Sequence, residues 1–429
     1  MMTRFAFGKT GIDISAPAAF DCAVLECKSA APLPDVNAAF NDALDHPLGS
    51  RPLVELARGK KTVAIVVCDI TRPAPNSVTL PPILARLHRA GIERDGITIL
   101  IATGLHRGAT PTELDQILGP DIAKSYRVVS NDARARGQHR DLGTTKRGTP
   151  VFIHNDLVDA DLRITLGFIE QHLMAGFSGG RKLVVPGVAA EATIKAIHSP
   201  RFMREPLATE GSIDGNPLHA ELLEIAHIAH HDFILDVTLT RDRQISGVFA
   251  GDPVLAHAAG VSFLQESSLE QIDRAADLVI TSASGFPLDL TFYQSVKAIT
   301  AAQHLLKRGG RILVVAECAE GVGSEEFSKK LRSLQSFETF LNETLHAPVE
   351  IDQWQLEKLA IASLASSLFF YTPGVKSEDL GLLRSQYFPS LEDAVLAATA
   401  GLPKGSKILL VPDGPYTFAR VQESVGARV

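Results

Sequence analysis

The run Thr62-Val63-Ala64-Ile65-Val66-Val67 is followed directly by Cys68-Asp69-Ile70-Thr71-Arg72-Pro73. Uninterrupted β-branched and apolar residues are typical of a strand buried on both faces of a parallel sheet. A helix near residues 82–90, stopped by Gly91, and a second apolar run at residues 97–102 complete a βαβ unit. The sequence therefore predicts an α/β fold.

A third predicted strand, residues 161–166, leads into residues 167–198, which read GFIEQHLMAGFSGGRKLVVPGVAAEATIKAIH. Within this stretch we expect a short strand at residues 182–186 and a helix at residues 189–198, ended by Ser199-Pro200. Two histidines, two lysines, an arginine and five glycines make it the richest candidate for a site.

A second α/β unit begins after a polar boundary near residues 266–273, with a strand at 278–281, a helix at 291–306 and a strand at 311–315. We expect two α/β domains with largely parallel sheets and an active site in the cleft between them. Residues 1–268 form the first domain, completed by residues 395–429 and their strand at 407–412. Residues 269–394 form the second.

Composition narrows the class of protein. The 429 residues are 45% hydrophobic and 21% charged, and the net charge is −7, so no basic surface favours nucleic acid. We see no signal peptide and no membrane span, and expect a cytoplasmic protein. The four cysteines lack the spacing of a metal site or disulfide framework, and Cys68 is expected to be a small buried residue.

Polar residues follow each of the three best strands. Asp69 and Arg72 follow the first, His106 the second and His172 the third, and ligands of open α/β sheets bind beyond the carboxyl ends of strands. Taken singly, Asp69 is equally explained as a turn cap, His106 as a surface residue and His172 as a partly buried histidine. Their shared position favours a site.

Two further patterns remain ambiguous. One is a glycine cluster that suits either a phosphate-binding loop or a plain tight turn; it consists of Gly176, Gly179 and Gly180 around Ser178 and precedes Arg181-Lys182. The order of these residues is not that of a Walker A motif. His227, His230 and His231 are better explained as helix-end residues than as metal ligands.

In the second unit, Tyr293 and Lys297 share a helix face, and Gln294 suits a capping box with Thr291.

Six motifs together resemble the nickel-pincer-nucleotide lactate racemase family. They are Cys68-Asp69-Ile70-Thr71-Arg72-Pro73, Gly104-Leu105-His106-Arg107, Glu170-Gln171-His172, Gly179-Gly180-Arg181-Lys182 with Pro186-Gly187, Ile197-His198-Ser199, and Tyr293-Gln294-Ser295-Val296-Lys297. Because they occur in the family's order over residues 62–306, the set is far more specific than any one motif.

The resemblance implies a racemase or epimerase that inverts C2 of a 2-hydroxy acid through a 2-oxo acid intermediate. Its cofactor is a pyridinium-3-thioamide-5-thiocarboxylic acid mononucleotide with nickel, the nickel-pincer nucleotide, which cofactor-synthesis proteins supply. The resemblance implies that the acid/base residues are His106 and His172, that the covalent attachment point is Lys182, and that the nickel ligand is His198. It implies that the substrate is bound by Arg72, Tyr293, Gln294 and Lys297. It also implies that the cofactor is lined by Asp69, Thr71, Ser178, Gly179, Gly180 and Arg181.

Elementary chemistry agrees with these roles. The C–H proton of a 2-hydroxy acid is weakly acidic, so hydride removal by an electron-poor pyridinium is easier than proton removal. A histidine suits the proton of the substrate hydroxyl, and the planar fork of Arg72 suits a carboxylate.

Two rival functions stay open at this stage. One is a nicotinamide-dependent 2-hydroxy-acid dehydrogenase, although no G-x-G-x-x-G follows a predicted strand. The other is a non-catalytic protein that binds a nucleotide or sugar acid. Lactate, malate, an aromatic lactate and an aldonic acid all remain possible substrates, and the sequence does not set the oligomeric state.

Overall fold

The computed structural model describes residues 2–422 and divides them into two compact units. Unit 1 comprises residues 2–28, 199–210 and 268–422, and unit 2 comprises residues 29–198 and 211–267. Each unit is built around its own sheet, and each is described by itself below.

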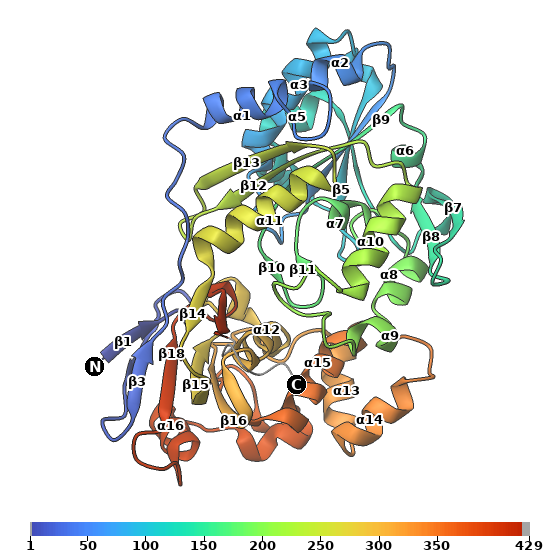
Figure 1. Cartoon of the computed structure of the whole chain (residues 1–429). Coiled ribbons are helices and arrows are strands. Elements are labelled where there is room, and N and C mark those ends of the chain that lie inside the picture. Colours follow the sequence, from blue (N-terminus) through green and yellow to red (C-terminus); the bar gives the residue numbers. More distant parts are fainter. Residues whose placement is uncertain (1, 423–429) are drawn as a thin grey trace. The chain divides into compact units, whose positions relative to one another are not determined.

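Unit 2 is built on a six-stranded sheet with the strand order β13-β12-β9-β4-β5-β6 (Figure 1). All neighbours are parallel except β12 and β13, which are antiparallel. The predicted fold class is therefore confirmed for this unit. The strands are β4 (Val63–Cys68), β5 (Ile97–Ala102), β6 (Arg127–Ser130), β9 (Leu162–Phe168), β12 (Phe233–Leu239) and β13 (Ile245–Gly251).

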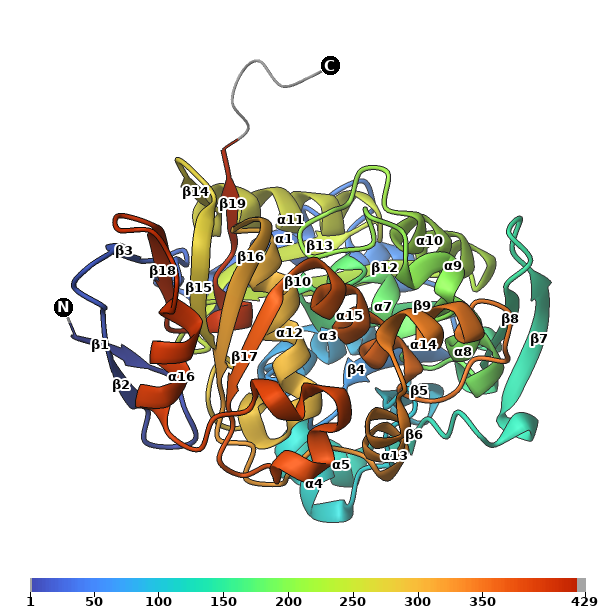
Figure 2. The same ribbon diagram turned by 90° about the horizontal axis from the view of Figure 1, so that it is seen from below.

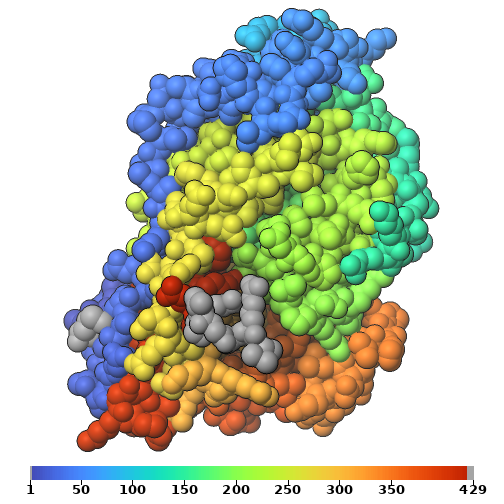
Figure 3. All heavy atoms as spheres, in the orientation of Figure 1, coloured from blue at the N-terminus to red at the C-terminus, as the bar shows by residue number. Residues whose placement is uncertain are grey.

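The first strand of the sequence analysis occupies the interior of this sheet. Every residue of β4 is buried, because β5 and β9 flank it and helices pack on it. α1 packs along edge strand β13, and Figure 3 shows these blue and yellow-green segments next to each other. The helices of unit 2 are α1 (Val36–Asp45), α2 (Leu53–Ala57), α3 (Asn76–Arg89), α4 (Pro111–Leu118), α5 (Pro120–Ser125), α6 (Asn155–Val158), α7 (Arg181–Val184), α8 (Glu191–Ile197), α10 (Pro217–Ile228) and α11 (Leu255–Ser268).

Two short hairpins project from unit 2. They are β7 (His139–Thr144) with β8 (Pro150–His154), and β10 (Gln171–His172) with β11 (Gly176–Phe177). The second hairpin carries His172, one of the candidate site residues.

Unit 1 holds a five-stranded, all-parallel sheet with the order β17-β16-β15-β18-β3 (Figure 2). Alternate side chains of β15 pack on opposite faces, as expected for a strand covered on both sides. Val279 joins the core that contains Val296 of α12, and Ile280 joins the core that contains Phe5 and Ala394. The strands are β3 (Asp21–Val24), β15 (Ala276–Ser282), β16 (Leu306–Val315), β17 (Ser367–Tyr371) and β18 (Lys407–Val411).

Helices cover both faces of this second sheet, and two strand pairs complete the unit. The helices are α9 (Pro200–Met203), α12 (Phe292–Gln303), α13 (Glu325–Ser333), α14 (Phe337–Thr344), α15 (Gln353–Ala365) and α16 (Leu391–Thr399). The pairs are β1 (Met2–Phe5) with β2 (Ile12–Ser15), and β14 (Glu270–Ile272) with β19 (Ala419–Val421).

The predicted assignment of the C-terminal segment to the first domain is wrong. Strand β18 does not return to the sheet of unit 2, because it lies between β15 and β3 in the sheet of unit 1. Residues 395–422 thus belong to unit 1, and so do residues 2–28, which we had assigned to the first domain. The residues 423–429 of the expected tail lie outside the described part. A buried apolar strand fits either sheet, so its sequence does not select the partner.

One predicted element is also wrong. Residues 182–186 were expected as a strand, but residues 181–184 form the single-turn helix α7. The amides of Lys182 and Leu183 donate to the carbonyls of Gly179 and Gly180, so the glycine turn starts a helix despite the β-branched residues that follow. Among the described residues, no helix is long and apolar enough to cross a membrane.

Candidate functional site

Three neighbouring strands of unit 2 end at the same edge of the sheet. β9, β4 and β5 are adjacent and parallel, so their carboxyl ends lie side by side. Asp69 follows β4, the loop of His106 follows β5, and the hairpin of His172 follows β9. The expectation that three strands direct polar residues to one rim is therefore confirmed.

Asp69 and His106 form a hydrogen-bonded pair at this rim. Nδ1 of His106 lies 2.7 Å from Oδ2 of Asp69, and the hydroxyl of Thr71 donates to Oδ1 of the same carboxylate over 2.7 Å. Asp69 is buried, whereas the side chain of His106 is half exposed. Because the carboxylate accepts the Nδ1 proton, the lone pair of a neutral His106 ring is on Nε2.

The environment of Asp69 keeps it ionised. Burial by itself would raise the pKa of this carboxyl group, but hydrogen bonds from His106 and Thr71 and the positive charge of Arg72 outweigh burial. The pKa of Asp69 therefore lies below its usual value, so a negative charge stands beside His106 across the neutral pH range. Such a charge stabilises the protonated form of an imidazole.

His172 is oriented by its own hairpin. Its Nδ1 accepts the main-chain N–H groups of Met174 and Ala175 over 3.3 and 3.2 Å. The other ring nitrogen, Nε2, lies 3.1 Å from Nζ of Lys182.

Lys182 is presented by the turn before it. Gly179 and Gly180 have φ angles of +80° and +47°, which L side chains rarely adopt, and they lead into α7. The amide of Gly187 donates to the carbonyl of Lys182 over 3.1 Å, which closes the turn. The lysine is thus held by main-chain bonds on both sides.

His198 lies at the carboxyl end of α8. Its Nδ1 lies 2.8 Å from the carbonyl oxygen of Ile194, one turn earlier, and donates to it. Burial, with a smaller contribution from the nearby Lys182, lowers the pKa of His198 to about 4 although the bond to Ile194 opposes this shift, so the ring is neutral at pH 7 with its lone pair on Nε2. A neutral imidazole in this tautomer is a metal-binding group.

The residues around Lys182 do not look like a phosphate loop. A Cβ at Gly179 would lie 2.5 Å from Oδ2 of Asp236, and a Cβ at Gly180 would lie 3.3 Å from the His257 ring, so protein atoms already occupy this space. The hydroxyl of Ser178 donates to the carbonyl of Phe168 and accepts the amide of Glu170. The glycine turn is therefore packed against protein atoms.

Arg181 differs from the expectation of a cofactor-binding side chain. It is only 1% exposed, and its guanidinium donates to the carbonyls of Ala175 and Phe177 over 3.0 and 3.1 Å. A third contact, 2.7 Å, joins it to Nε2 of His257. Arg181 therefore supports the hairpin from the interior of unit 2.

The candidate residues of the second half lie on α12 of unit 1. Tyr293 packs edge-on against Phe327, and the main-chain amide of Gln294 donates to the carbonyl of Thr291. The proposed capping box is wrong, because Thr291 makes no side-chain cap bond. Instead, Oε1 of Gln294 is buried and has no hydrogen-bond partner among the described residues. Lys297 lies one turn further along the helix.

The three neighbouring histidines after α10 take up separate environments. His227 lies in the last turn of α10, His230 has a φ angle of +53°, and His231 is buried with Nε2 3.0 Å from the hydroxyl of Thr165. Burial lowers the pKa of His231 to about 4, so this ring is not the imidazolium expected at a helix end. The described residues contain no cluster of three or more histidine, cysteine or acidic side chains suited to a metal.

Sequence reasoning missed two buried residues that support the site, Asp236 and Asn131. Asp236 is an acid inside the apolar strand β12, and this contrast was the available signal. Asn131 joins three segments through its amide: Oδ1 lies 2.9 Å from Nε2 of His139, and Nδ2 lies 3.4 Å from the carbonyls of Gly104 and Ala189. Nothing in the sequence around Asn131 distinguishes it from a turn residue.

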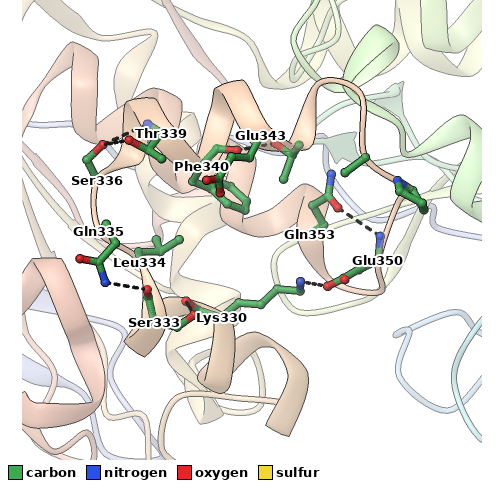
Figure 4. A pocket seen from close by; sticks show the side chains of 13 residues that line it. Lys330, Ser333, Leu334, Gln335, Ser336, Thr339, Phe340, Glu343, Glu350 and Gln353 are labelled. Atoms are coloured by element: carbon green, nitrogen blue, oxygen red, sulfur yellow. Dashed lines mark hydrogen bonds and ion pairs between the residues drawn. The ribbon is translucent and has the colours of Figure 1, made fainter.

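Two cavities in the described part of the chain contain none of the candidate residues. One, of about 300 Å³, lies beside α13, α14 and α15 of unit 1, and its polar groups bond to one another, as Lys330 to Glu350 and Ser336 to Thr339 (Figure 4). The other, of about 460 Å³, lies between α10 and α11 of unit 2 and includes His219 and His257. Neither cavity therefore marks the candidate site, which is located by the positions of its own side chains.

The fold and the rim residues define a class of protein: a two-unit α/β protein in which Asp69, His106 and His172 follow the strand ends of one unit, with the half-buried Lys182 beside His172. Family models support this class, since the lactate racemase N-terminal domain matches residues 7–211 and the lactate racemase C-terminal domain matches residues 272–417. The chain is 35% identical over 381 residues to the lactate racemase of Thermoanaerobacterium thermosaccharolyticum, which covers 88% of this chain and 89% of the relative. It is 36% identical over 376 residues to that of Lactiplantibacillus plantarum, which covers 87% and 88%.

Solved structures agree. The lactate racemase apoprotein from Thermoanaerobacterium thermosaccharolyticum superimposes with a TM-score of 0.90 and 32% identity, over 99% of this chain and 100% of that one. A protein from Thermotoga maritima shares the fold, with a TM-score of 0.62 and 16% identity over 86% of this chain and 96% of that one. The chain belongs to the lactate racemase family. It is therefore an isomerase, a racemase, and the resemblance stated from its motifs is confirmed.

Proposed function

We propose that this racemase inverts C2 of a 2-hydroxy acid by moving a hydride to and from a nickel-pincer pyridinium nucleotide attached to Lys182. The observation that carries the proposal is the placement of four residues in unit 2. His106 is paired with Asp69, Nε2 of His172 lies 3.1 Å from Nζ of Lys182, and His198 is a neutral imidazole because burial and, to a smaller extent, the nearby Lys182 lower its pKa.

The residues fit such a group. A tethered cofactor needs an amine at a fixed place, which the turn before α7 provides at Lys182. Nickel held mainly by the cofactor needs one further soft or borderline ligand, and Nε2 of His198 is suited to that role because Nδ1 is bonded to Ile194. When bound, the cofactor supplies an electron-poor ring carbon that takes up a hydride from the substrate and returns it.

The protein's own residues handle the substrate's proton and carboxylate. Nε2 of a neutral His106 accepts the hydroxyl proton, and Asp69 stabilises the resulting imidazolium. His172 serves as the second acid/base group, so that a proton is taken on one side of the planar 2-oxo acid and returned on the other. Arg72, in the loop that follows β4, offers its guanidinium to the carboxylate of the substrate.

The residues of α12 complete this proposal from unit 1. The buried amide oxygen of Gln294, which has no partner among the described residues, suits a hydrogen bond to the substrate. Tyr293 and Lys297 are proposed to contact the substrate with it. Lactate is the first substrate to test, because the two curated relatives are lactate racemases.

The decisive experiment measures covalent attachment directly. The chain is produced together with the cofactor-synthesis proteins, and its intact mass, the modified peptide and its nickel content are determined. We expect an adduct on Lys182 and about one nickel per chain. Lys182→Arg, which keeps the charge but cannot form the thioamide, is the matched control and should carry no adduct.

An unmodified Lys182 without nickel, in cells where a known lactate racemase is loaded, would refute the proposal. Reduction of a nicotinamide cofactor by a 2-hydroxy acid in that sample would instead support the dehydrogenase alternative.

A further inference from the structure

A buried carboxyl group lies directly beneath the turn that carries Lys182. Asp236 is 0% exposed in the middle of β12, where it pairs in register with Gly167 of β9. Its Oδ2 accepts the amide of Gly180 over 2.8 Å. A buried carboxyl group is unfavourable unless it is bonded, so a role for this contact is expected.

The surrounding glycines show how closely the carboxyl group fits. A Cβ at Gly179 would lie 2.5 Å from Oδ2 of Asp236, and a Cβ at Gly167 would lie 2.8 Å from Oδ1. A side chain at Gly179 would thus meet Asp236, and one at Gly167 would meet both Asp236 and Leu183. Of the glycines that first suggested a phosphate-binding loop, Gly179 instead makes room for this acid, and Gly180 donates its amide to it.

Arg181, the neighbour of Lys182, extends the contact to the His172 hairpin. Burial lowers the pKa of Arg181 to about 9 and raises that of Asp236 to about 7, and the charge of each group opposes the shift of the other. The guanidinium of Arg181 binds the carbonyls of Ala175 and Phe177. The amides of Met174 and Ala175 in the same hairpin donate to Nδ1 of His172.

We propose that Asp236 and Arg181 are positioning residues that hold Lys182 and His172 in register for cofactor attachment. Asp236 fixes the turn before Lys182 through Gly180, and Arg181 fixes the hairpin that orients His172. Neither residue touches the substrate. This inference rests on the proposed attachment of the cofactor at Lys182.

The test compares Asp236→Ala with Asp236→Asn and with Glu221→Gln. Alanine removes the acceptor for the Gly180 amide, whereas asparagine keeps one oxygen for it. Burial raises the pKa of Asp236 to about 7, so an uncharged side chain resembles a form that the acid itself adopts near neutral pH. Glu221 is a comparably buried acid of unit 2 whose carboxylate accepts a hydrogen bond from the hydroxyl of Thr145 and makes no bond to the turn.

Two quantities are measured. The first is hydrogen exchange of peptides covering residues 172–184 in the protein without cofactor, and the second is the rate at which the Lys182 adduct forms, followed by mass. For Asp236→Ala we expect at least tenfold faster exchange at residues 180–182 and at least tenfold slower adduct formation. Asp236→Asn should recover most of both, and Glu221→Gln should change neither.

The loaded fraction of each variant is then assayed for racemisation. Misplacement of His172 should lower kcat with little change in KM, whereas a general loss of folded protein would leave kcat per loaded chain unaltered. If Asp236→Ala does not fold, Arg181→Lys takes its place, because it keeps the charge but removes the planar guanidinium, whose Nη2 donates to both carbonyls while Nη1 contacts His257. It should accelerate exchange at residues 174–177.

The possible outcomes separate the two proposals. Unmodified wild-type Lys182 would refute the proposed function, and the exchange data would still decide the positioning role. Wild-type exchange and wild-type loading in Asp236→Ala would overturn this inference. Equal defects in Glu221→Gln would also overturn it, since they would show a general effect of buried acids.

Discussion

Asp69 illustrates how one side chain sets the protonation state of another. Its carboxylate accepts a hydrogen bond from Nδ1–H of the half-exposed His106 over 2.7 Å and another from the hydroxyl of Thr71. The lowered pKa of Asp69 means that this partner is charged throughout the working pH range. The atom of a neutral His106 that is available to accept a proton is therefore Nε2.

Asp69→Asn should reduce racemisation strongly. The amide keeps the size of the side chain but removes the charge that stabilises protonated His106, so we expect kcat to fall by roughly 10²-fold, the usual contribution of one acid/base group. Chromatography that separates the two enantiomers measures the rate. The exposed Asp121→Asn is the control, and an unchanged kcat in Asp69→Asn would contradict the role of the pair.

Asp236 should make stability depend on pH in a defined direction. Burial raises its pKa from 3.8 to about 7, against the opposing effects of the Gly180 amide and Arg181. The folded protein thus binds this proton more tightly than the unfolded chain does. The stabilising contribution is complete below about pH 4, declines as the pH rises to about 7, and is lost above that value.

Between about pH 4 and pH 7, the unfolding free energy of the wild type should therefore fall by up to about 4 kcal/mol relative to that of Asp236→Asn. A pKa raised by about three units corresponds to a free energy of this size. Urea unfolding of both proteins at a series of pH values measures the difference. Parallel curves for the two proteins would show that Asp236 does not titrate in this range.

At the scale of elements, the rim depends on bonds between segments that are distant in sequence. Asn131, after β6, binds the carbonyl of Gly104 before the His106 loop and that of Ala189 before α8. The same side chain meets His139 of β7. One buried amide thus connects the loop of His106 with α8, which leads directly to His198.

Asn131→Ala should weaken both the fold and the site. It leaves buried carbonyls without a donor, which costs about 1–3 kcal/mol of unfolding free energy. Because Gly104 and Ala189 lose their common partner, we also expect lower nickel retention in the loaded protein. Denaturant unfolding and metal analysis test both effects. Asn155→Ala, whose amide binds Gly137 near the surface, should preserve the nickel; equal nickel loss in both variants would argue against a specific link.

At the scale of the whole molecule, the chain crosses between its two units more than once. Residues 199–210 belong to unit 1 although unit 2 surrounds them in sequence, and His198 is the last residue before this crossing. Buried bonds secure the segment within unit 1. Arg204 binds Glu357 over 2.9 Å, His304 lies 3.1 Å from Glu210, and Lys358 donates to the carbonyl of Ala208.

Arg204→Ala should destabilise unit 1. The side chain of Glu357 is fully buried, so loss of the guanidinium leaves a buried acid with Gln353 as its remaining hydrogen-bond partner among the described residues. Breaking such a pair from one side costs about 3 kcal/mol. Differential scanning calorimetry should show a lower transition temperature, and the exposed Arg308→Ala in the same unit should not. An unchanged transition would indicate that Glu357 finds another partner.

The sequence by itself determined the α/β class, the strands Val63–Cys68, Ile97–Ala102 and Leu162–Phe168, and the family, because buried parallel strands and six ordered motifs are local patterns. It also predicted that Asp69, His106 and His172 follow strand ends at one rim. Periodicity and strand order suffice for that inference.

The tertiary structure alone decided what these residues contact. Partners that are distant in sequence decide which sheet β18 joins and whether Arg181 is buried. They also decide whether Gly179 faces a ligand or Asp236. Such contacts leave no local period in the chain, since a buried acid 56 residues after Gly180 obeys packing and hydrogen bonding rather than sequence spacing.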